Sequence, residues 1–306
     1  MDTVAVLLNY NDADTTIDAI ERLKACKSLD KLIVVDNAST DDSSERLSAY
    51  ESQEVLLIKA KENLGYGAGN NLGLCYAYKK LGASYALIAN PDTVIEDVVI
   101  SKLRKSFDKI KDLAAAAPVM RLKAKKTPAF KDRVLSLTLG FPCRSFIKEL
   151  TECCPVSRRL FVRFLHYNRK HYRKDIAFVD AVAGSLLMVD IKKVLEAGGY
   201  DENIFLYQEE AVLGFKLKQR AYKTVLLTRY SYIHAHSQSI SKSFHKLLSR
   251  QRLREESVLY YFKHYLKAGK LKIAFAKTVF ALVRIEIILF DILSGLCKRP
   301  EDKEKS

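Results

Sequence analysis

Short apolar runs that each end in a polar cluster recur through the first ninety residues, at positions 4–8, 31–35, 55–58 and 85–89. Apolar residues at helical spacing fill the segments between them, at positions 15–26, 41–50 and 71–81. Buried strands that alternate with helices form βαβ units, whose strands are parallel. The sequence therefore predicts an α/β fold with a mostly parallel sheet flanked by helices.

The polar residues that follow these runs are candidates for a ligand site. Asn9 and Tyr10 follow the first run, Asp36, Asn37, Ser39 and Asp41 follow the second, and Asn90 and Asp92 follow the fourth. Because parallel strands place their carboxyl ends at one edge of a sheet, we expect these side chains to meet in one crevice. Asp92 also suits Mg²⁺ or Mn²⁺ bridging a diphosphate. Two simpler roles stay open: Ser39 or Thr40 caps the next helix, and Pro91 forms an ordinary turn.

A glycine-rich stretch at positions 64–71 has the sequence Leu-Gly-Tyr-Gly-Ala-Gly-Asn-Asn. It lacks the third glycine of a dinucleotide-binding fingerprint and the Gly-Lys-Ser/Thr of a phosphate-binding loop. We expect a glycine-rich turn here that lets the backbone approach a ligand, followed by a helix from Asn71. A tight turn without a ligand is the alternative.

The second half of the chain contains three regions of different character. Positions 121–176 are basic and aromatic, and we interpret them as an insertion. Strand-like and helical segments return at positions 177–189, 209–221, 224–227 and 230–233. The tail from position 246 is helical, and charges interrupt its apolar stretch too often for a spanning helix. Both an interfacial helix pair and helices that pack on the core fit this tail.

Charge and cysteine content narrow the class of protein. The 51 Lys and Arg exceed the 36 Asp and Glu and give a formal charge of +15, which favours polyanionic partners such as nucleic acid, anionic lipid or phosphorylated small molecules. No nucleic-acid-binding module is recognisable, and we predict no nucleic-acid partner. The six cysteines form no Cys-x-x-Cys pair, and the start of the chain lacks the pattern of a signal peptide. We therefore expect a reducing, cytoplasmic location.

Taken in order, four motifs resemble those of family 2 inverting glycosyltransferases, especially the bacterial rhamnosyltransferase-like branch. They lie at positions 9–10, 35–41, 63–71 and 89–92. The resemblance resumes at positions 183–188, 199–210 and 234–237, so it covers roughly residues 1–120 and 176–240. It implies a GT-A catalytic domain over residues 1–245, with the basic insertion at about 121–176, and a helical, membrane-associating segment over residues 246–306.

The resemblance also implies roles for particular residues. Asp36 contacts the nucleotide, and the donor side includes Asn9, Tyr10, Asn37, Ser39, Asp41, Asn63, Gly65, Gly67, Asn70 and Asn90. Asp92 takes the place of the final Asp of the metal-binding Asp-x-Asp motif, with His234, slightly favoured, or His236 as a second ligand. Glu210 takes the place of the catalytic base, with Glu209 in reserve, because Glu-Glu-Ala-Val stands where the family commonly has Glu-Asp-x-Asp. Gly184 and Tyr207 lie on the acceptor side.

The implied reaction is a single displacement with inversion, in which a base deprotonates an acceptor hydroxyl and Mg²⁺ or Mn²⁺ stabilises the departing nucleoside diphosphate. The branch points to rhamnose from dTDP-rhamnose and to a polyprenyl-diphosphate-linked saccharide acceptor in bacterial surface polysaccharide and cell wall biosynthesis. The basic segments suit docking on the anionic inner face of the cell membrane. A degenerate transferase kept as a binding or scaffold protein is one alternative, suggested by Glu210 and Val212. A nucleotidyltransferase is the other, although residues 9–12 lack its basic glycine-rich loop.

Overall fold

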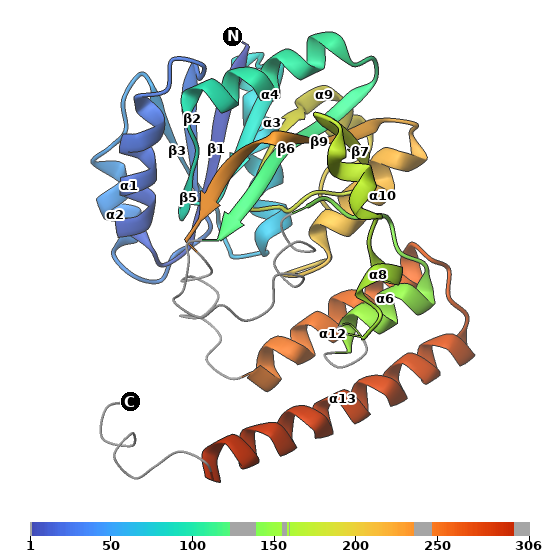
Figure 1. Ribbon diagram of the computed structural model, residues 1–306. Coiled ribbons are helices and arrows are strands. Elements are labelled where there is room, and N and C mark those ends of the chain that lie inside the picture. The colour runs from blue at the N-terminus through green and yellow to red at the C-terminus, as the bar shows by residue number, and fades with distance from the viewer. Residues whose placement is uncertain (1, 123–138, 155–157, 159, 236–246, 297–306) are drawn as a thin grey trace.

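The computed structural model describes residues 2–122, 139–154, 158, 160–235 and 247–296 (Figure 1). The first half contains β1 (Thr3–Asn9), α1 (Ala13–Lys24), β2 (Lys31–Asp36), α2 (Ser43–Ser48), β3 (Val55–Lys59), α3 (Tyr66–Leu81), β4 (Tyr85–Ala89), β5 (Thr93–Val94), α4 (Asp97–Lys109) and β6 (Leu113–Leu122). The second half contains α6 (Phe146–Cys153), α8 (Val162–Leu165), a 3₁₀ helix (Arg169–Arg173), β7 (Ile176–Val179), β8 (Leu186–Asp190), α9 (Ile191–Glu196), α10 (Glu209–Gln219), β9 (Lys223–His234), α12 (Leu247–His264) and α13 (Lys270–Leu296).

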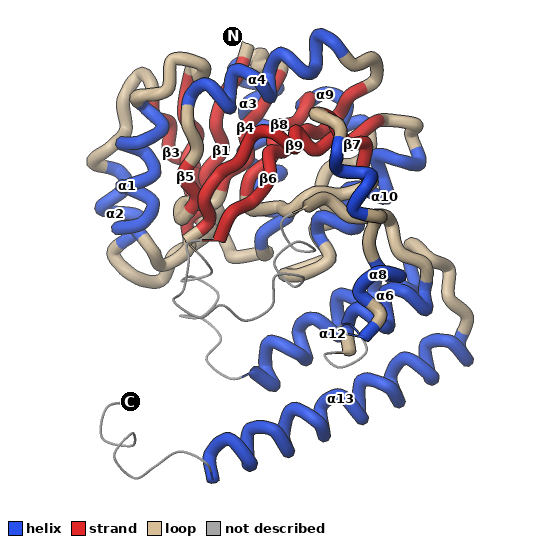
Figure 2. Tube along the Cα trace, viewed as in Figure 1, coloured by secondary structure: helices blue, strands red, loops and turns tan. Residues whose placement is uncertain are grey.

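The strands of the described residues form one mixed sheet in the order β3-β2-β1-β4-β8-β6-β9-β5, with β7 paired to β9. β3, β2, β1 and β4 are parallel neighbours, whereas β8 runs antiparallel to β4 and β6. Helices lie on both faces of the sheet (Figure 2). The predicted α/β fold, with a mostly parallel sheet flanked by helices, is confirmed.

The apolar runs are continuous because the central strands are buried on both faces. In β1, Val4 and Val6 belong to the apolar cluster on one face of the sheet, and Ala5 and Leu7 belong to the cluster on the other. All four side chains have no exposed surface. Successive side chains of a strand point to opposite faces of the sheet, so this one short run contributes to two apolar cores.

The prediction of a glycine-rich turn before Asn71 is wrong for most of that stretch, because α3 begins at Tyr66. Only Gly65, with φ +95°, makes the turn, and a Cβ there would lie 2.1 Å from the backbone oxygen of Phe205. Gly69 lies inside the helix, where a Cβ would meet Leu8 Cδ1 at 2.3 Å. Gly69 and Gly73, whose added Cβ atoms would meet Leu8 and Val6, therefore let α3 pack closely on β1.

The predicted cap at Ser39 or Thr40 is also wrong. α2 begins at Ser43, whose backbone N–H donates a hydrogen bond to Asp41 Oδ1 at 3.0 Å. Ser39 is instead engaged with Asp36, to which its hydroxyl donates. Ser39 is thus a hydrogen-bond partner of Asp36 and does not cap the helix.

The sequence pattern did not reveal β6, because its four successive alanines at 114–117 have a low preference for strands. The strand nevertheless lies between β8 and β9, and these alanines are at most 2% exposed. A register shift against β9 falls after Pro118, which cannot donate to the ladder.

A third apolar cluster joins α6 to the C-terminal helices. It contains Leu150 and Cys153 of α6, Val258, Tyr261 and Phe262 of α12, Ala276 and Phe280 of α13, and Ile204 and Val212. Helix α12 and the inner face of α13 therefore pack as core helices (Figure 1). Val212 is fully buried in this cluster, so packing accounts for the apolar side chain at this position. Across the described part of the chain, every helix is too short or too polar to cross a membrane.

Candidate active site

The loops after β1 and β2 are tied together by a buried polar network. Asn9 lies opposite Asp36 in the parallel register, and its Nδ2 donates to Asp36 Oδ1 at 2.9 Å and to Ser39 Oγ at 3.1 Å. Its Oδ1 accepts from the Thr16 hydroxyl at 2.7 Å. Asn11, whose φ is +52°, donates its backbone N–H to Ser39 Oγ. The ends of β1 and β2 therefore meet as expected, and Asn90 and Asp92 take no part in these hydrogen bonds.

A second group of hydrogen bonds extends this network toward the start of α3. Asn37 Nδ2 donates to Asn63 Oδ1 at 2.8 Å and to the Gly65 carbonyl at 3.2 Å. Asn63 Oδ1 also accepts from the Gly65 backbone N–H. The next residue, Tyr66, donates its hydroxyl to the Gly184 carbonyl at 2.7 Å. These contacts connect the donor-side loops to the segment that faces α10.

Asp92 and His234 meet although they lie far apart in the sequence. The short strand β5 pairs antiparallel with the end of β9, with Thr93 opposite His234, and the Ala235 N–H donates to the Asp92 carbonyl. Asp92 Oδ1 lies 3.1 Å from His234 Nε2, and both side chains are 11% exposed. A carboxylate oxygen beside an imidazole nitrogen is a donor set that fits Mn²⁺ or Mg²⁺.

No group of three or more His, Cys, Asp and Glu side chains that could hold a metal occurs within residues 2–122, 139–154, 158, 160–235 and 247–296. A cation at Asp92 and His234 therefore needs further oxygen ligands, and phosphate oxygens are the usual source for a hard cation. His236 lies outside the described residues.

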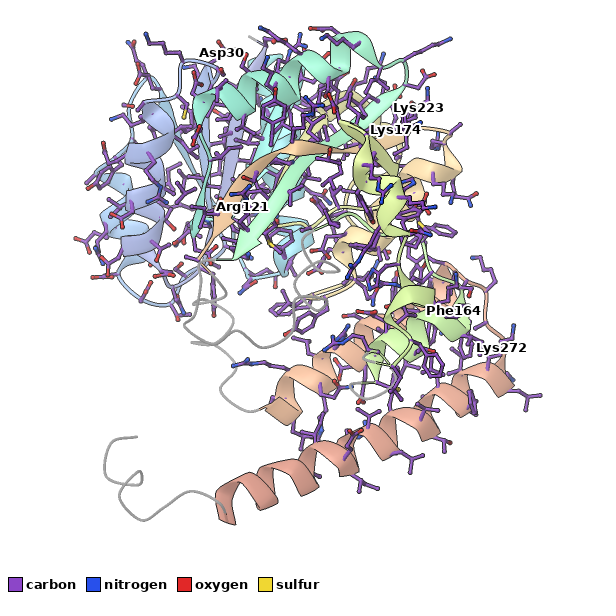
Figure 3. The ribbon with its side chains drawn as sticks, in the orientation of Figure 1. Asp30, Arg121, Phe164, Lys174, Lys223 and Lys272 are labelled. Atoms are coloured by element: carbon purple, nitrogen blue, oxygen red, sulfur yellow. The ribbon has the colours of Figure 1, made fainter. Side chains whose placement is uncertain are left out.

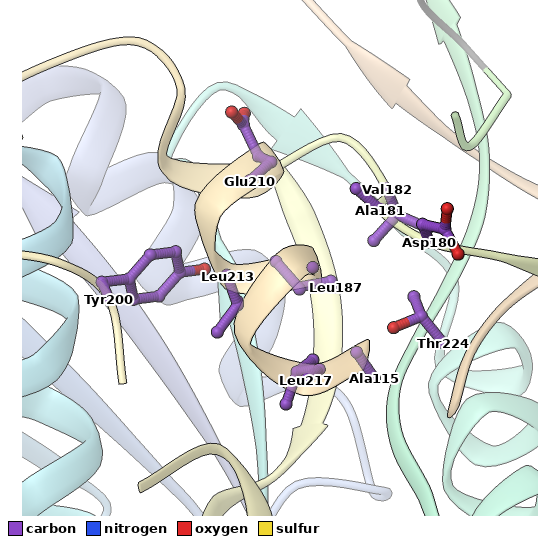
Figure 4. A pocket seen from close by; sticks show the side chains of 11 residues that line it. Ala115, Asp180, Ala181, Val182, Leu187, Tyr200, Glu210, Leu213, Leu217 and Thr224 are labelled. Carbon is purple, nitrogen blue, oxygen red and sulfur yellow. The ribbon is translucent and has the colours of Figure 1, made fainter. Parts of the chain in front are cut away.

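The first turn of α10 presents Glu210 to the segment before β8. The Gly184 backbone N–H donates to Glu210 Oε1 at 3.1 Å, and a Cβ on Gly184 would lie only 2.7 Å from that oxygen. Figure 4 shows the Glu210 carboxylate pointing away from Leu213 and Leu217, which follow it on α10. A glycine at position 184 is thus what allows the carboxylate to sit against the backbone.

Burial raises the pKa of both glutamates at this helix start, and that of Glu209, which also feels the charge of Glu210, rises to about 8. The hydrogen bond from Gly184 favours the charged form of Glu210. Glu209 is 4% exposed, and its Oε1 has no hydrogen-bond partner among the described residues. With a pKa of about 8, Glu209 is therefore mostly protonated at neutral pH.

A cleft of about 480 Å³ brings many of these groups together. The predicted site residues that line it are Asn90, Gly184, Tyr207, Glu209, Glu210 and His234. Asn9, Asp36 and Asn37 are 1, 2 and 4% exposed, and they support the loops from beneath. Tyr10 is half-buried on its loop, and Asp41 is exposed.

Gly67 and Asn70 do not line this cleft. A Cβ on Gly67 would lie 2.9 Å from Tyr200 Cβ, and Asn70 Nδ2 donates to the Tyr66 carbonyl inside α3. Their donor-side assignment therefore has no support in this geometry, because helix packing accounts for both residues.

Several lining residues were not expected from the sequence. They are Tyr66, Ser185, Gln208 and the four arginines Arg144, Arg158, Arg250 and Arg254. The spacing of Arg250 and Arg254, one helical turn apart, was a signal that both lie on one face of a helix. Nothing in the sequence placed that face against the cleft.

Comparison with known proteins gives one family match and one curated relative. The model of the family "Glycosyl transferase family 2" matches residues 5–174. A low-salt glycan biosynthesis hexosyltransferase of Haloferax volcanii is 28% identical over 102 residues, which are 33% of this chain and 31% of the relative. The match thus spans about a third of the relative's length.

Solved structures share the fold at low sequence identity. GalNAc-T7 with UDP, GalNAc and Mn²⁺ superposes with a TM-score of 0.59 and 14% identity, over 78% of this chain and 44% of that chain. The mannosyltransferase of Pyrobaculum calidifontis, in complex with GDP-Man and Mn²⁺, superposes with a TM-score of 0.57 and 12% identity, over 97% of this chain and 76% of that chain. The α/β fold is therefore that of GT-A glycosyltransferases.

Proposed function

The chain belongs to glycosyl transferase family 2, and from this premise we propose that it transfers one sugar, with inversion, from a nucleoside-diphosphate donor to an acceptor hydroxyl. The observation that carries the proposal is the shared cleft. Glu210, which accepts a hydrogen bond from the Gly184 N–H, lines the same cavity as Asn90 and His234. A base and a cation site on one cavity are what a single displacement requires.

In this mechanism Glu210 accepts the proton of the acceptor hydroxyl as the hydroxyl oxygen bonds to the anomeric carbon. The bond from that carbon to the diphosphate oxygen breaks, and the nucleoside diphosphate leaves with the electron pair. Attack from the face opposite the leaving group inverts the sugar configuration. The Gly184 N–H holds the base in place, and Glu209 keeps its proton.

Asp92 and His234 would hold the divalent cation, which when bound supplies positive charge to the departing diphosphate. The neighbours with nucleotide ligands contain Mn²⁺, which supports a divalent cation of this kind here. Asp36 and the network around Asn9 and Asn37 shape the loops on which the nucleotide rests.

The donor and acceptor that we propose are dTDP-rhamnose and a polyprenyl-diphosphate-linked saccharide, in bacterial surface polysaccharide biosynthesis. The donor rests on the resemblance of the four strand-end motifs to the rhamnosyltransferase-like branch. The curated relative is a hexosyltransferase of glycan biosynthesis, which supports sugar transfer onto a growing saccharide.

Donor binding is tested by the thermal unfolding of the protein with UDP-, dTDP- and GDP-sugars, with and without Mn²⁺. We expect one nucleotide class to stabilise the protein only when Mn²⁺ is present, by about 2.7 kcal/mol at a ligand concentration 100 times its dissociation constant. A shift with dTDP-rhamnose alone supports the rhamnosyl donor. A folded protein that no donor stabilises would instead be a degenerate scaffold.

We also propose that α13 docks the enzyme on an anionic membrane surface. Its inner side is buried at Ala276, Phe280 and Val283, whereas an outer stripe is exposed at Leu271 (88%), Phe275 (53%), Leu282 (62%), Ile285 (53%) and Ile288 (43%). Exposed Lys270, Lys272 and Lys277 are on the same helix. Figure 3 shows side chains projecting from α13 away from α12. An apolar stripe with lysines suits an interfacial helix.

Replacing Leu282 and Ile285 together by Glu should weaken binding to phosphatidylglycerol vesicles by at least about tenfold, because each buried aliphatic side chain contributes roughly 1.5–3 kcal/mol. Val98→Glu is the matched control, since Val98 is 52% exposed on α4, at the opposite end of the molecule from α13 (Figure 1). Co-sedimentation measures the effect. Equal loss with both variants, or no binding by the unmodified protein, would overturn the proposed docking.

A further inference from the structure

Four arginines line one side of the cleft, and neither the base nor the cation site uses them. Arg144 precedes α6 and Arg158 follows it, whereas Arg250 and Arg254 lie one turn apart on α12. The basic insertion and the C-terminal helix, which are distant in the sequence, thus build this wall together. We call these four residues the arginine cluster.

Arg144 is the most buried member of the arginine cluster, at 9% exposure. It forms ion pairs with Glu149 at 3.4 Å and Glu152 at 3.8 Å, and its Nε has no hydrogen-bond partner among the described residues. The wall thus carries four guanidinium groups, and the buried Arg144 keeps one donor without a partner among the described residues.

His166 lines the same cleft as the arginine cluster. Burial lowers its pKa to about 4, and the charges of Arg144 and Arg158 add to the effect. A carboxylate oxygen of Glu152 lies only 3.7 Å from the ring. The imidazole therefore stays neutral next to this carboxyl group, chiefly because it is buried and in addition because Arg144 and Arg158 are close.

Hydrogen bonds connect the arginine cluster to the base. Glu149, which pairs with Arg144, accepts from Gln208 Nε2 at 2.6 Å. Tyr207 and Gln208 have φ values of +70° and +71°, which residues with side chains seldom adopt. Such a turn persists where its surroundings hold it, and here it leads directly into Glu209 and Glu210. A ligand at the arginines would contact the same network that positions the base.

We propose that the arginine cluster binds the diphosphate group of the acceptor and so sets the acceptor hydroxyl against Glu210. The guanidinium fork matches phosphate oxygens in pairs, and four forks at the edge of one cavity suit a group with several anionic oxygens. Asp92 and His234 mark a separate place for the diphosphate of the donor. This inference rests on the proposed function for its choice of ligand, and it deepens that function by naming the chemistry that selects the acceptor.

The test is calorimetric titration of the full chain with inorganic pyrophosphate in EDTA, so that no divalent cation can hold the probe at the donor site. We expect Arg250→Gln and Arg254→Gln each to weaken pyrophosphate binding by about tenfold or more, because each removes charge-assisted hydrogen bonds. Arg252→Gln is the matched control, since it removes the same charge from an exposed position on the same helix. The two tested arginines are half-buried, and thermal melting establishes that each variant is folded.

Equal binding by all three variants, or no binding of millimolar pyrophosphate by the unmodified protein, would overturn the proposal. Loss of phosphatidylglycerol vesicle binding in Arg250→Gln and Arg254→Gln with unchanged pyrophosphate binding would also overturn it, because the ligand would then be a bilayer headgroup. The titration needs neither donor nor turnover. The two proposals can therefore fail separately. If the glycosyl transfer proposal is wrong, no donor stabilises the protein, although pyrophosphate still binds and its binding still depends on the arginines.

Discussion

Glu210→Gln should lower turnover by about a hundredfold to ten-thousandfold, the usual contribution of a general base. The amide keeps the size of the carboxylate, and its oxygen can still accept the hydrogen bond from the Gly184 N–H. We therefore expect the fold and the affinity for the donor to be retained. Initial rates measured beside donor-induced stabilisation separate the two effects, because only the rate should fall.

Glu209→Gln is the companion variant. Since burial and the charge of Glu210 raise the pKa of Glu209 to about 8, the residue is protonated at pH 7, and a neutral amide resembles its native state. Turnover should change far less than in Glu210→Gln. A larger loss of turnover in Glu209→Gln than in Glu210→Gln would instead identify Glu209 as the base. Unchanged turnover in both variants would show that neither glutamate acts as the base.

The pH dependence of turnover has a definite sign. Burial raises the pKa of Glu210, and a base acts only when it is deprotonated. Turnover should therefore rise with pH through that raised pKa, and Glu210→Gln should lose this rise.

Asp92→Asn is expected to lower turnover by at least about a hundredfold, because stabilisation of the leaving diphosphate by a bound cation contributes several kcal/mol. The amide lacks the negative charge that a hard cation requires. The Mn²⁺-dependent part of the donor-induced stabilisation should disappear with it. His234→Ala should show the same loss, because the two side chains lie 3.1 Å apart at Oδ1 and Nε2.

Asp108→Asn is the control for this prediction. Asp108 is 60% exposed near the end of α4, so its loss removes the same kind of charge away from the cleft. Full Mn²⁺-dependent stabilisation of Asp92→Asn by the donor would show that the cation is held elsewhere.

Local pattern determined much of the parallel half of the fold. The apolar runs at β1, β2 and β4 needed no tertiary information, since central strands buried on both faces are apolar almost throughout. The polar residues after β1 and β2 met as expected, because parallel strands end at one edge, but of the predicted strand-end residues only Asn90 lines the cleft. The pattern failed at β6 and at the start of α3. Alanine has a low preference for strands, yet β6 pairs with β8 and β9, and glycine has a low preference for helices, yet Gly69 lets α3 pack against β1.

The sequence by itself determined the order of the strands' polar ends and the residue types of the candidate site, including Asp92, Glu209 and Glu210. Only the tertiary structure decided which of them meet. The pairing of β5 with β9 set His234 beside Asp92, and burial placed the proton on Glu209. The packing of α6 on α12 brought the four arginines to the cleft. The spacing of residues along the chain does not predict such contacts, because burial and long-range strand pairing arise only when the sheet and its helices have folded.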